Sequence, residues 1–274
     1  MALALENVSK HFGSLVAIKN LSLSFDAGSI YSIIGPNGAG KSTVVNMVAG
    51  SYTVTSGIIR LGSSILNKLP KYRIAQLGVA RTYQNLRLFD GMTVLENLEV
   101  CFFPQSWVTI LTGAKRLSKA ERLHVCHACL EQFHLSDVSD VLAGDLPYGR
   151  QKMLELARAF VTEAPVVLLD EPAAGLNHTE TKAMATMIAS LKRNDRAIIL
   201  VEHDMDMVMS ISDRIDVLNY GELLCSGTPE QVRTNERVQE AYLGTTEELD
   251  DIRKLAQSRR AQGGLRSNAG IVRH

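Results

Sequence analysis

The stretch Gly35-Pro-Asn-Gly-Ala-Gly-Lys-Ser-Thr43 decides the fold of this chain. It has the spacing G-x-x-x-x-G-K-[ST], in which two glycines frame a loop that a lysine and a hydroxyl residue complete. The apolar run at residues 30–34 precedes it and is typical of a buried strand, and residues 42–49 can continue as a helix. The sequence therefore predicts a strand, a glycine-rich loop and a helix in direct succession.

This succession suits a bound phosphate group. Glycines allow the backbone to bend closely enough for consecutive N–H groups to point at phosphate oxygens, and the helix N-terminus adds a partial positive charge. Lys41 would reach the β- and γ-phosphates, and the Ser42 hydroxyl would bind Mg²⁺. We therefore predict that this phosphate-binding loop (P-loop) binds a nucleotide through Gly35, Pro36, Asn37, Gly38, Ala39, Gly40, Lys41, Ser42 and Thr43.

Length and composition limit the class of protein. The 274 residues suffice for one large α/β domain or for one domain with an insertion. The 29 basic and 29 acidic side chains give a formal net charge of zero, which argues against a nucleic-acid partner. The four cysteines are too few and too unevenly spaced for a disulfide scaffold, so a reducing cytosol is expected. No apolar stretch approaches the roughly 20 residues of a transmembrane helix, so a role in transport would need membrane partners.

The rest of the sequence pattern predicts an α/β fold with a mostly helical region inserted between its strands. Residues 56–57 are interpreted as the turn of an early hairpin. A mostly helical region is predicted over about residues 86–161. Apolar runs at residues 166–169 and 197–201 then predict parallel core strands, with a helix between them at residues 179–192.

Two acidic residues, Asp170 and Glu171, directly follow the strand predicted at residues 166–169. Because ligands bind at the carboxyl ends of parallel strands, both side chains are expected beside the P-loop. Asp170 would hold Mg²⁺, and Glu171 would act as general base on the attacking water, a contribution of about 10²–10⁴ in rate. A capped turn before a loop is the structural alternative.

Two further polar side chains are expected near the same edge. His203 follows the strand predicted at residues 197–201 and would reach the γ-phosphate; a loop or capping role is the alternative. Gln84 lies where the strands give way to the helical region, and it would sense Mg²⁺ or the attacking water. The predicted catalytic residues are thus Glu171, His203 and Gln84, and the predicted Mg²⁺ ligands are Ser42, Gln84 and Asp170.

Over residues 3–244 these features resemble the nucleotide-binding subunits of ATP-binding cassette (ABC) transporters. The segment Leu146-Pro-Tyr-Gly-Arg-Gln-Lys-Met-Leu-Glu-Leu-Ala-Arg158 occupies the place of that family's signature sequence. Pro147 and Gly149 stand at a predicted helix start, whose N–H groups and dipole would face an anion. In the family, that anion is the γ-phosphate held by the second subunit of a dimer.

The signature segment also departs from the family pattern. Pro147 stands in place of the usual serine, and Tyr148 and Arg150 stand in place of glycine and glutamine. Contact with the nucleotide of the other subunit would therefore rest on backbone N–H groups and on Arg150. The resemblance implies that Pro147, Tyr148, Gly149 and Arg150 contact that nucleotide.

Two more segments match the family. Residues 174–177 match its dimer-contact loop, with Asn177 where aspartate is common. Phe12 matches the aromatic residue that stacks on adenine, and a core phenylalanine in a strand is the alternative.

The resemblance implies an α/β P-loop NTPase (RecA-like) core with an N-terminal antiparallel β-subdomain and an inserted α-helical subdomain. This nucleotide-binding domain would span residues 3–244, and residues 245–274 would form a C-terminal extension that we expect to be mobile, with a regulatory tail as the alternative. The implied enzyme hydrolyses ATP with Mg²⁺ at the interface of two ATPase subunits, as a homodimer or a heterodimer. It would act with transmembrane permease subunits, and indirectly with a solute-binding protein, at the cytoplasmic face of the cell membrane.

Narrower features indicate a branch of the family. Residues 81–89, the Leu-Pro-Tyr-Gly variant and residues 237–244 resemble the importer ATPases for branched-chain and other hydrophobic amino acids. Importers of urea and short amides share much of this pattern and remain an alternative. A soluble ABC-type ATPase that acts on DNA or ribosomes is an alternative from another class, although the sequence lacks duplicated cassettes and coiled-coil insertions. A small-molecule kinase would not explain the signature segment.

Two other clusters need an interpretation. The run His124-Val-Cys-His-Ala-Cys129 resembles a metal site, but its cysteines share a helical stripe with Leu130 and Phe133, and no second cysteine pair completes a zinc site. We therefore predict buried cysteines on an ordinary helix. Phe102, Phe103 and Trp107 could form the apolar patch that accepts a helix of the membrane subunit, or they could pack within the helical region.

Overall fold

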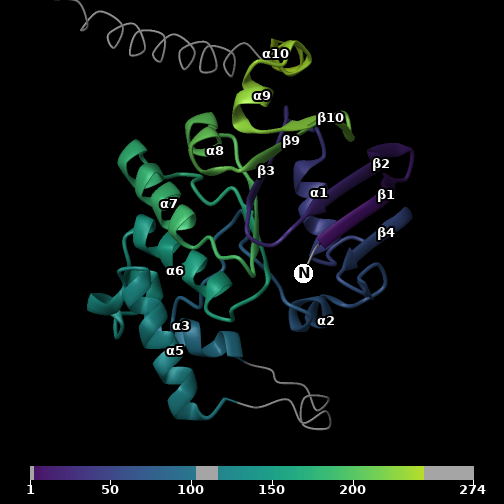
Figure 1. Ribbon diagram of the computed structural model, residues 1–274. Coiled ribbons are helices and arrows are strands. Elements are labelled where there is room, and N and C mark those ends of the chain that lie inside the picture. Colours follow the sequence, from purple (N-terminus) through teal and green to yellow (C-terminus); the bar gives the residue numbers. More distant parts are fainter. Residues whose placement is uncertain (1–2, 103–116, 244–274) are drawn as a thin grey trace, which may run out of the picture.

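Two β-sheets organise the chain, of which the computed structural model describes residues 3–102 and 117–243 (Figure 1). The first sheet is antiparallel, with the strand order β2-β1-β4-β5, and consists of β1 (Leu3–Phe12), β2 (Leu15–Phe25), β4 (Ser56–Leu61) and β5 (Ser64–Ile65). The second has the order β10-β9-β3-β8-β7-β6 and consists of β3 (Ile30–Ile34), β6 (Val79–Arg81), β7 (Val166–Asp170), β8 (Ala197–Val201), β9 (Arg214–Asn219) and β10 (Glu222–Gly227).

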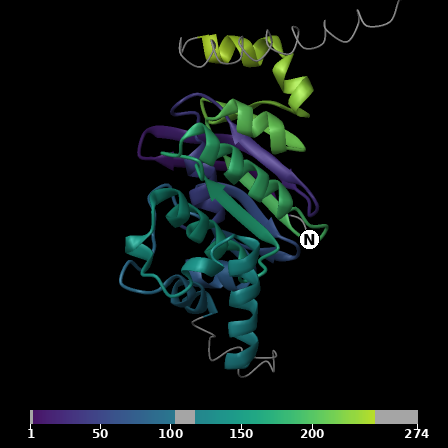
Figure 2. The same cartoon turned by 90° about the vertical axis from the view of Figure 1, so that its left-hand side faces the viewer.

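Helices surround the second sheet and extend away from it. They are α1 (Lys41–Val48), α2 (Lys71–Gln76), α3 (Val94–Glu99), α5 (Lys119–Gln132), α6 (Tyr148–Phe160), α7 (His178–Ser190), α8 (Met205–Ile211), α9 (Pro229–Arg233) and α10 (Glu236–Leu243), with short 3₁₀ turns η1 (Val100–Phe102), η2 (Ser136–Val138) and η3 (Ala143–Asp145). In Figure 2, α5 and its neighbours form one end of the molecule, and α9 and α10 form the other. No helix in the described part of the chain is long and apolar enough to cross a membrane.

The strand, loop and helix predicted around the P-loop are confirmed. All five residues of β3 are buried, and α1 begins at Lys41. The apolar side chains of α1, among them Val44 and Val48, share one core with residues of the antiparallel sheet and of β7 and β8. Burial on all sides explains why the strand reads as a continuous apolar run rather than as an alternating one.

The order of the parallel strands brings the predicted site residues to one edge. β3 pairs in parallel with β8, β8 with β7, and β7 with β6. The carboxyl ends of neighbouring parallel strands lie at the same edge, so the segments that follow them meet there. These segments contain the P-loop after β3, His203 after β8, Glu171 after β7 and Gln84 after β6.

The helical region predicted from about residue 86 to 161 contains α3, η1, α5 and α6. Its apolar side chains pack with α7 and with β7 and β8, in a second core that includes Leu130, Leu154, Met184 and Leu169. The α/β class with an antiparallel first sheet and an inserted helical region is therefore confirmed. Phe103 and Trp107 of the predicted apolar patch, and the predicted C-terminal extension at residues 245–274, lie outside the described residues.

The hairpin turn predicted at residues 56–57 is wrong. These residues begin β4, and the turn to β5 follows Leu61. Gly57 has φ +84°, and a Cβ there would lie 2.3 Å from the carbonyl oxygen of Asn7. The glycine is therefore required by the close approach of β1 at an irregularity in the β1–β4 ladder, and not by a turn.

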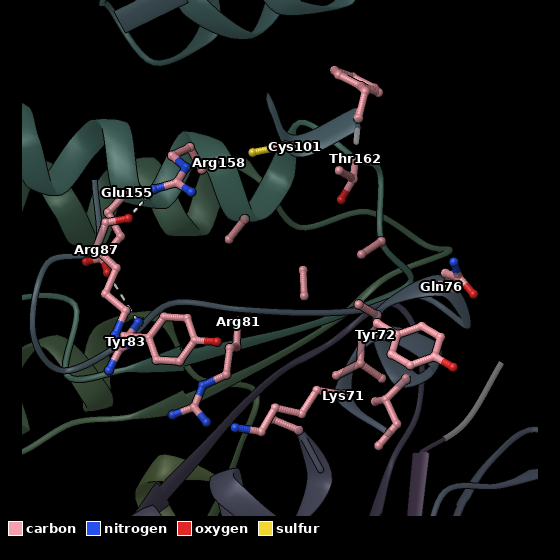
Figure 3. A pocket seen from close by; sticks show the side chains of 18 of the residues that line it. Lys71, Tyr72, Gln76, Arg81, Tyr83, Arg87, Cys101, Glu155, Arg158 and Thr162 are labelled. Atoms are coloured by element: carbon pink, nitrogen blue, oxygen red, sulfur yellow. Dashed lines mark hydrogen bonds between the residues drawn. The ribbon is translucent and has the colours of Figure 1, made fainter. Parts of the chain in front are cut away.

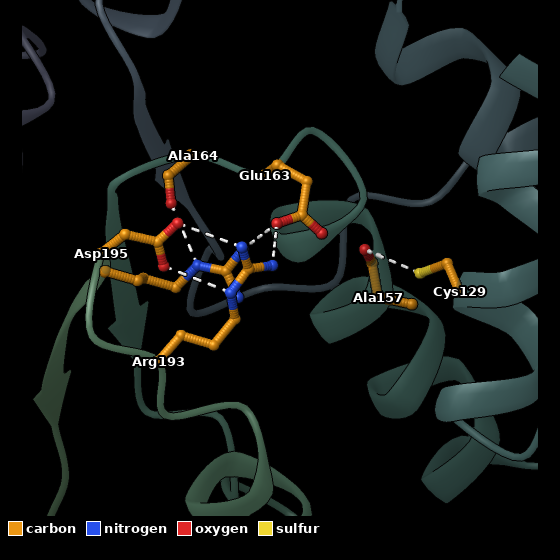
Figure 4. A network of polar contacts seen from close by, with 7 residues as sticks. Cys129, Ala157, Glu163, Ala164, Arg193 and Asp195 are labelled. Atoms are coloured by element: carbon orange, nitrogen blue, oxygen red, sulfur yellow. Dashed lines mark hydrogen bonds and ion pairs between the residues drawn. The ribbon is translucent and has the colours of Figure 1, made fainter. Parts of the chain in front are cut away.

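A polar network joins the end of α6 to the segment before β8 (Figure 4). The carboxylate of Glu163 accepts hydrogen bonds from Arg193 and, at 2.9 Å, from Arg196. The Arg196 side chain is 4 % exposed, and its Nε donates to the carbonyl oxygen of Ala164 at 3.1 Å. These contacts fix the amino ends of β7 and β8, which is the side of the sheet opposite the site.

The metal-like run around Cys126 forms an ordinary helix, as predicted. Cys126 and Cys129 of α5 are buried in the helical core, whereas His124 and His127 are exposed. The four side chains therefore do not converge. Among the described residues, no group of three or more His, Cys, Asp and Glu side chains is arranged to hold a metal ion.

These two thiols should be unreactive while the protein is folded. Burial raises the pKa of Cys126 to about 11 and that of Cys129 to about 12, so both are protonated at pH 8, and the thiolate is the reactive form. A disulfide reagent such as dithionitrobenzoate should modify them only in urea. The partly exposed Cys225 serves as control, because Cys225→Ser should remove a thiol that reacts in the folded protein. If a thiol of the folded protein were labelled rapidly and Cys129→Ser abolished that labelling, the result would contradict this packing.

Candidate nucleotide-binding and catalytic site

The P-loop backbone requires glycine at both framing positions. Gly35 has φ +149°, and a Cβ there would lie 2.1 Å from the carbonyl oxygen of Leu218 in β9. Gly40 has φ +103°, and its Cβ would lie 2.5 Å from the Ile18 side chain of β2. The loop is thus held tightly between the two sheets, and no residue with a side chain fits at either position.

Lys41 lies within this loop. Its side chain is buried, and its ammonium group donates hydrogen bonds to the carbonyl oxygens of Gly35 at 2.6 Å and Pro36 at 3.2 Å. The positive charge is therefore held inside the curve of the loop. A phosphate placed there would meet both this charge and the N-terminus of α1.

Asp170, at the end of β7, has one engaged and one unengaged carboxylate oxygen. Its Oδ2 lies 3.1 Å from Nη2 of Arg81, and the Arg81 Nη1 donates to Asn46 of α1 at 2.9 Å. Its Oδ1 is buried and has no hydrogen-bond partner among the described residues. Burial raises the pKa of this carboxyl group, and the nearby Arg81 guanidinium opposes that rise.

The unengaged oxygen of Asp170 suits a cation. A buried carboxylate oxygen is costly unless a hydrogen-bond donor or a metal ion satisfies it, and Mg²⁺ takes oxygen ligands from one or two carboxylates, phosphates and water. Asp170 fits the predicted Mg²⁺ site on this observation. Ser42, in the first turn of α1, offers a hydroxyl group at an exposed position.

Glu171 is held between the other two predicted catalytic residues. Its Oε1 lies 2.9 Å from Nε2 of His203, and its Oε2 accepts a hydrogen bond from the Gln84 amide at 3.1 Å. The backbone of Glu171 has φ +50°, a conformation that is costly for a residue with a side chain. The structure therefore brings the side chains of Gln84, Glu171 and His203 together.

Glu202 is a functional candidate that the sequence reasoning missed. It is 5 % exposed, and its carboxylate accepts hydrogen bonds from the backbone N–H of Ala173 at 2.8 Å and of His203 at 3.0 Å. Burial raises its pKa, and these hydrogen bonds oppose the rise. Glu202 thereby joins the turn that carries His203 to the loop that follows Glu171. In the sequence, an acidic residue between a predicted buried strand and His203 could have indicated a role for Glu202 at this edge of the sheet.

The signature segment begins α6, as predicted. Pro147 is the N-cap residue, and no side chain caps this helix end. The Tyr148 hydroxyl donates to the carbonyl oxygen of Ala174 at 3.0 Å, so the helix start contacts the predicted dimer-contact loop. In that loop, Asn177 caps α7 by accepting hydrogen bonds from the N–H groups of Thr179 and Glu180 at 3.0 Å.

Two predicted nucleotide contacts have other partners within the chain. The Arg150 guanidinium lies 2.7 Å from Asp137, in an exposed ion pair, so contact with a second subunit would compete with that pair. Phe12, at the end of β1, is 41 % exposed, which excludes the alternative of a core phenylalanine. Its ring meets that of Tyr52 edge to face at 5.2 Å between centroids.

A groove of about 1000 Å³ opens beside Gln84, between α2, β6 and α6 (Figure 3). It carries aromatic and cationic side chains. The centroid of the Tyr83 ring lies 4.6 Å from the Arg81 guanidinium and 4.8 Å from that of Arg87, and the Arg158 guanidinium lies 5.1 Å from the centroid of the Phe89 ring. Phe102, predicted to belong to an apolar patch, lines the same groove.

Removal of Arg81 should destabilise the protein through Asp170. Arg81→Met would leave a buried carboxylate without its cation, which typically costs about 3–5 kcal/mol. Urea unfolding at pH 7 measures this loss. Arg60→Met is the control, because its ion pair with Glu6 is exposed and should contribute no more than about 1 kcal/mol. Equal losses in the two variants would contradict a structural role of the Arg81–Asp170 pair.

Comparison with known proteins agrees with this geometry. Residues 18–174 match the ABC transporter family model, and residues 222–248 match that of the branched-chain amino acid ATP-binding cassette transporter. The chain is 45 % identical to the high-affinity branched-chain amino acid transport ATP-binding protein LivG of Salmonella typhimurium over 248 residues, which cover 88 % of this chain and 97 % of LivG.

Solved structures show the same fold. The ADP conformation of MJ1267, an ATP-binding cassette of an ABC transporter, has a TM-score of 0.78 at 29 % identity and covers 89 % of this chain and 99 % of that one. A dimeric post-hydrolysis state of the cassette MJ0796, bound to ADP and phosphate, has a TM-score of 0.69 at 25 % identity, with 83 % and 98 % covered. The chain belongs to the ABC transporter family, as an ATP-hydrolysing subunit in the branch that includes LivG.

Proposed function

We propose that this chain is the ATPase subunit of an importer for branched-chain or other hydrophobic amino acids, and that Gln84, Glu171 and His203 form its hydrolytic centre. The observation that carries the proposal is the Glu171 carboxylate, held between His203 and Gln84 at the strand edge beside the P-loop. The resemblance to LivG over nearly the whole of both chains supports the substrate class.

The reaction follows from these positions. The Glu171 carboxylate takes a proton from a water molecule as the water oxygen attacks the γ-phosphorus, and the bond between that phosphorus and the bridging oxygen of ADP breaks. Lys41 and the N–H groups at the start of α1 stabilise the phosphate charge, and His203 holds the general base in place. When bound, Mg²⁺ would supply further positive charge at the phosphates. Asp170 and Ser42 would hold it.

A second subunit would complete the site. The start of α6 carries Pro147 and Tyr148 in place of a serine and a glycine, so backbone N–H groups at a helix N-terminus are what it offers to an anion. Pro147 and Tyr148 are both exposed, as a contact with another chain requires. The cassette MJ0796 is dimeric in its complex with ADP and phosphate. We infer that two ATPase subunits enclose each nucleotide between the P-loop of one and the α6 N-terminus of the other.

The groove beside Gln84 would hold a cytoplasmic helix of the permease. Its exposed rings, Tyr72 and Phe89 among them, and its arginines are the residue types that dominate binding energy in protein interfaces. Because Tyr83 lines this groove and Gln84 follows it, a helix seated there would bias the position of the Gln84 amide against Glu171. Because the ATPase subunit would bind the permease, its proposed location is the cytoplasmic face of the membrane.

Glu171→Gln should separate nucleotide binding from hydrolysis. The amide keeps the size of the carboxylate but cannot accept the proton, so hydrolysis should fall at least about 10²-fold. ATP should then accumulate at the interface, and light scattering after gel filtration should show a dimer. Lys41→Ala is the control and should stay monomeric with ATP. A Glu171→Gln protein that stays monomeric with ATP and Mg²⁺ at high concentration would contradict the shared site.

Phe89→Asp should disrupt docking on the permease. A carboxylate in place of this half-exposed ring removes an aromatic anchor from the groove, so roughly tenfold less ATPase subunit should co-purify with co-expressed permease subunits. ATP affinity should not change. Ile65→Asp is the matched control, because Ile65 is similarly exposed but lies on β5, outside the groove. Equal co-purification of the two variants would exclude the groove as the docking site.

A further inference from the structure

A buried ion pair on α6 is not explained by the site described above. The Lys152 side chain is 1 % exposed and that of Glu155 is 7 % exposed, with Nζ 3.6 Å from Oε2. The Lys152 ammonium has no hydrogen-bond partner among the described residues. Well-packed apolar residues of similar volume are often at least as stable as a buried ion pair, so a buried pair is weak evidence for a role in stability alone.

The carboxylate end of the pair contacts the Gln84 turn. The Glu155 Oε1 accepts a hydrogen bond from the backbone N–H of Tyr83 at 3.2 Å. The next residue, Gln84, donates its amide to Glu171. Figure 3 shows Glu155 on α6 above the segment that carries Tyr83. A buried carboxylate on the signature helix therefore fixes the backbone from which the catalytic glutamine projects.

The ammonium end of the pair lies near Tyr148, which contacts the dimer-contact loop. Lys152 Nζ lies 6.0 Å from the centroid of the Tyr148 ring, within the range of a cation–π contact. The Tyr148 hydroxyl donates to Ala174 at 3.0 Å, and a Cβ on Gly175 would lie 3.0 Å from the ring. The ring therefore packs directly on the backbone of the loop, and Gly175 permits that approach.

These contacts connect the two ends of the loop that follows Glu171 to helix α6. Glu171 contacts Gln84, and the neighbouring Tyr83 backbone donates to Glu155 of α6. Ala174, in the same loop, contacts Tyr148 of α6, which lies near Lys152. We propose that Lys152 and Glu155 are positioning residues that fix the Gln84 turn and the dimer-contact loop to one helix. A shift of α6 would then move the glutamine and the contact loop together. The role in hydrolysis rests on the proposed function, whereas the mechanical link does not.

Hydrogen exchange tests the link directly. Lys152→Met removes the charge that faces Tyr148, and amide exchange should accelerate roughly fivefold or more both at residues 83–85 and at residues 174–177. Lys192→Met is the matched control: its ion pair with Asp213 is exposed, and exchange in both segments should stay as in the wild type. Acceleration confined to one of the two segments would overturn the proposed link. This measurement needs no hydrolysis, so its result is independent of the proposed function.

A double variant separates positioning from stability. Each single change leaves one buried charge unpaired, whereas Lys152→Met with Glu155→Met removes both charges and should restore the denaturation midpoint towards that of the wild type. The double change also removes the oxygen that accepts the hydrogen bond from Tyr83. In the permease complex, kcat of the double variant should nevertheless fall roughly 10- to 100-fold with KM for ATP unchanged. A stable double variant with wild-type kcat would overturn the positioning role. Tyr148→Phe, which removes only the hydroxyl group, should lower kcat in the same way, and unchanged turnover would exclude the Tyr148 step.

Discussion

The parallel pairing of β3, β8, β7 and β6 is the constraint on which the rest of the structure depends. Each strand ends at the same edge, and each is followed by a segment that carries predicted site residues. The P-loop comes from one strand, and the residues around Glu171 come from the other three. Because backbone hydrogen bonds fix the register of these strands, residues distant in sequence meet without a flexible connection between them.

Conformational cost is concentrated where these segments leave the sheet. Gly35 and Gly40 adopt backbone angles in which any side chain would collide with β9 or β2. Glu171 carries a side chain in the left-handed region, and the N–H of Glu171 donates to Val201 at 2.8 Å, which continues the β7–β8 ladder into the turn. Glu202, which follows β8, accepts a hydrogen bond from Ala173 in the loop after Glu171. Strain in the backbone of Glu171 is thus balanced by hydrogen bonds to the neighbouring strand and its following turn.

Much of this architecture was predictable because it follows local rules. The G-x-x-x-x-G-K-S spacing, the continuous apolar strands and the acidic pair at the end of β7 can each be recognised within a short window of sequence. The partners of these residues could not be predicted in the same way. Nothing local indicates that Arg81 meets Asp170, or that Glu155 meets the backbone of Tyr83, because these pairings depend on how α6 and β6 pack in three dimensions. The misplaced hairpin at Gly57 has the same origin, since the glycine is required by another strand.

The guanidinium of Arg81 has a consequence for ion choice. Because it occupies one carboxylate oxygen of Asp170, that side chain would present its other oxygen to the proposed ion and would act as a monodentate ligand. Calcium binds six to eight oxygens and often takes both oxygens of a carboxylate, whereas magnesium keeps a small octahedral shell with several waters. At the proposed site, the Arg81 guanidinium would therefore disfavour calcium relative to magnesium. Ion choice would then depend partly on a residue that does not itself bind the metal.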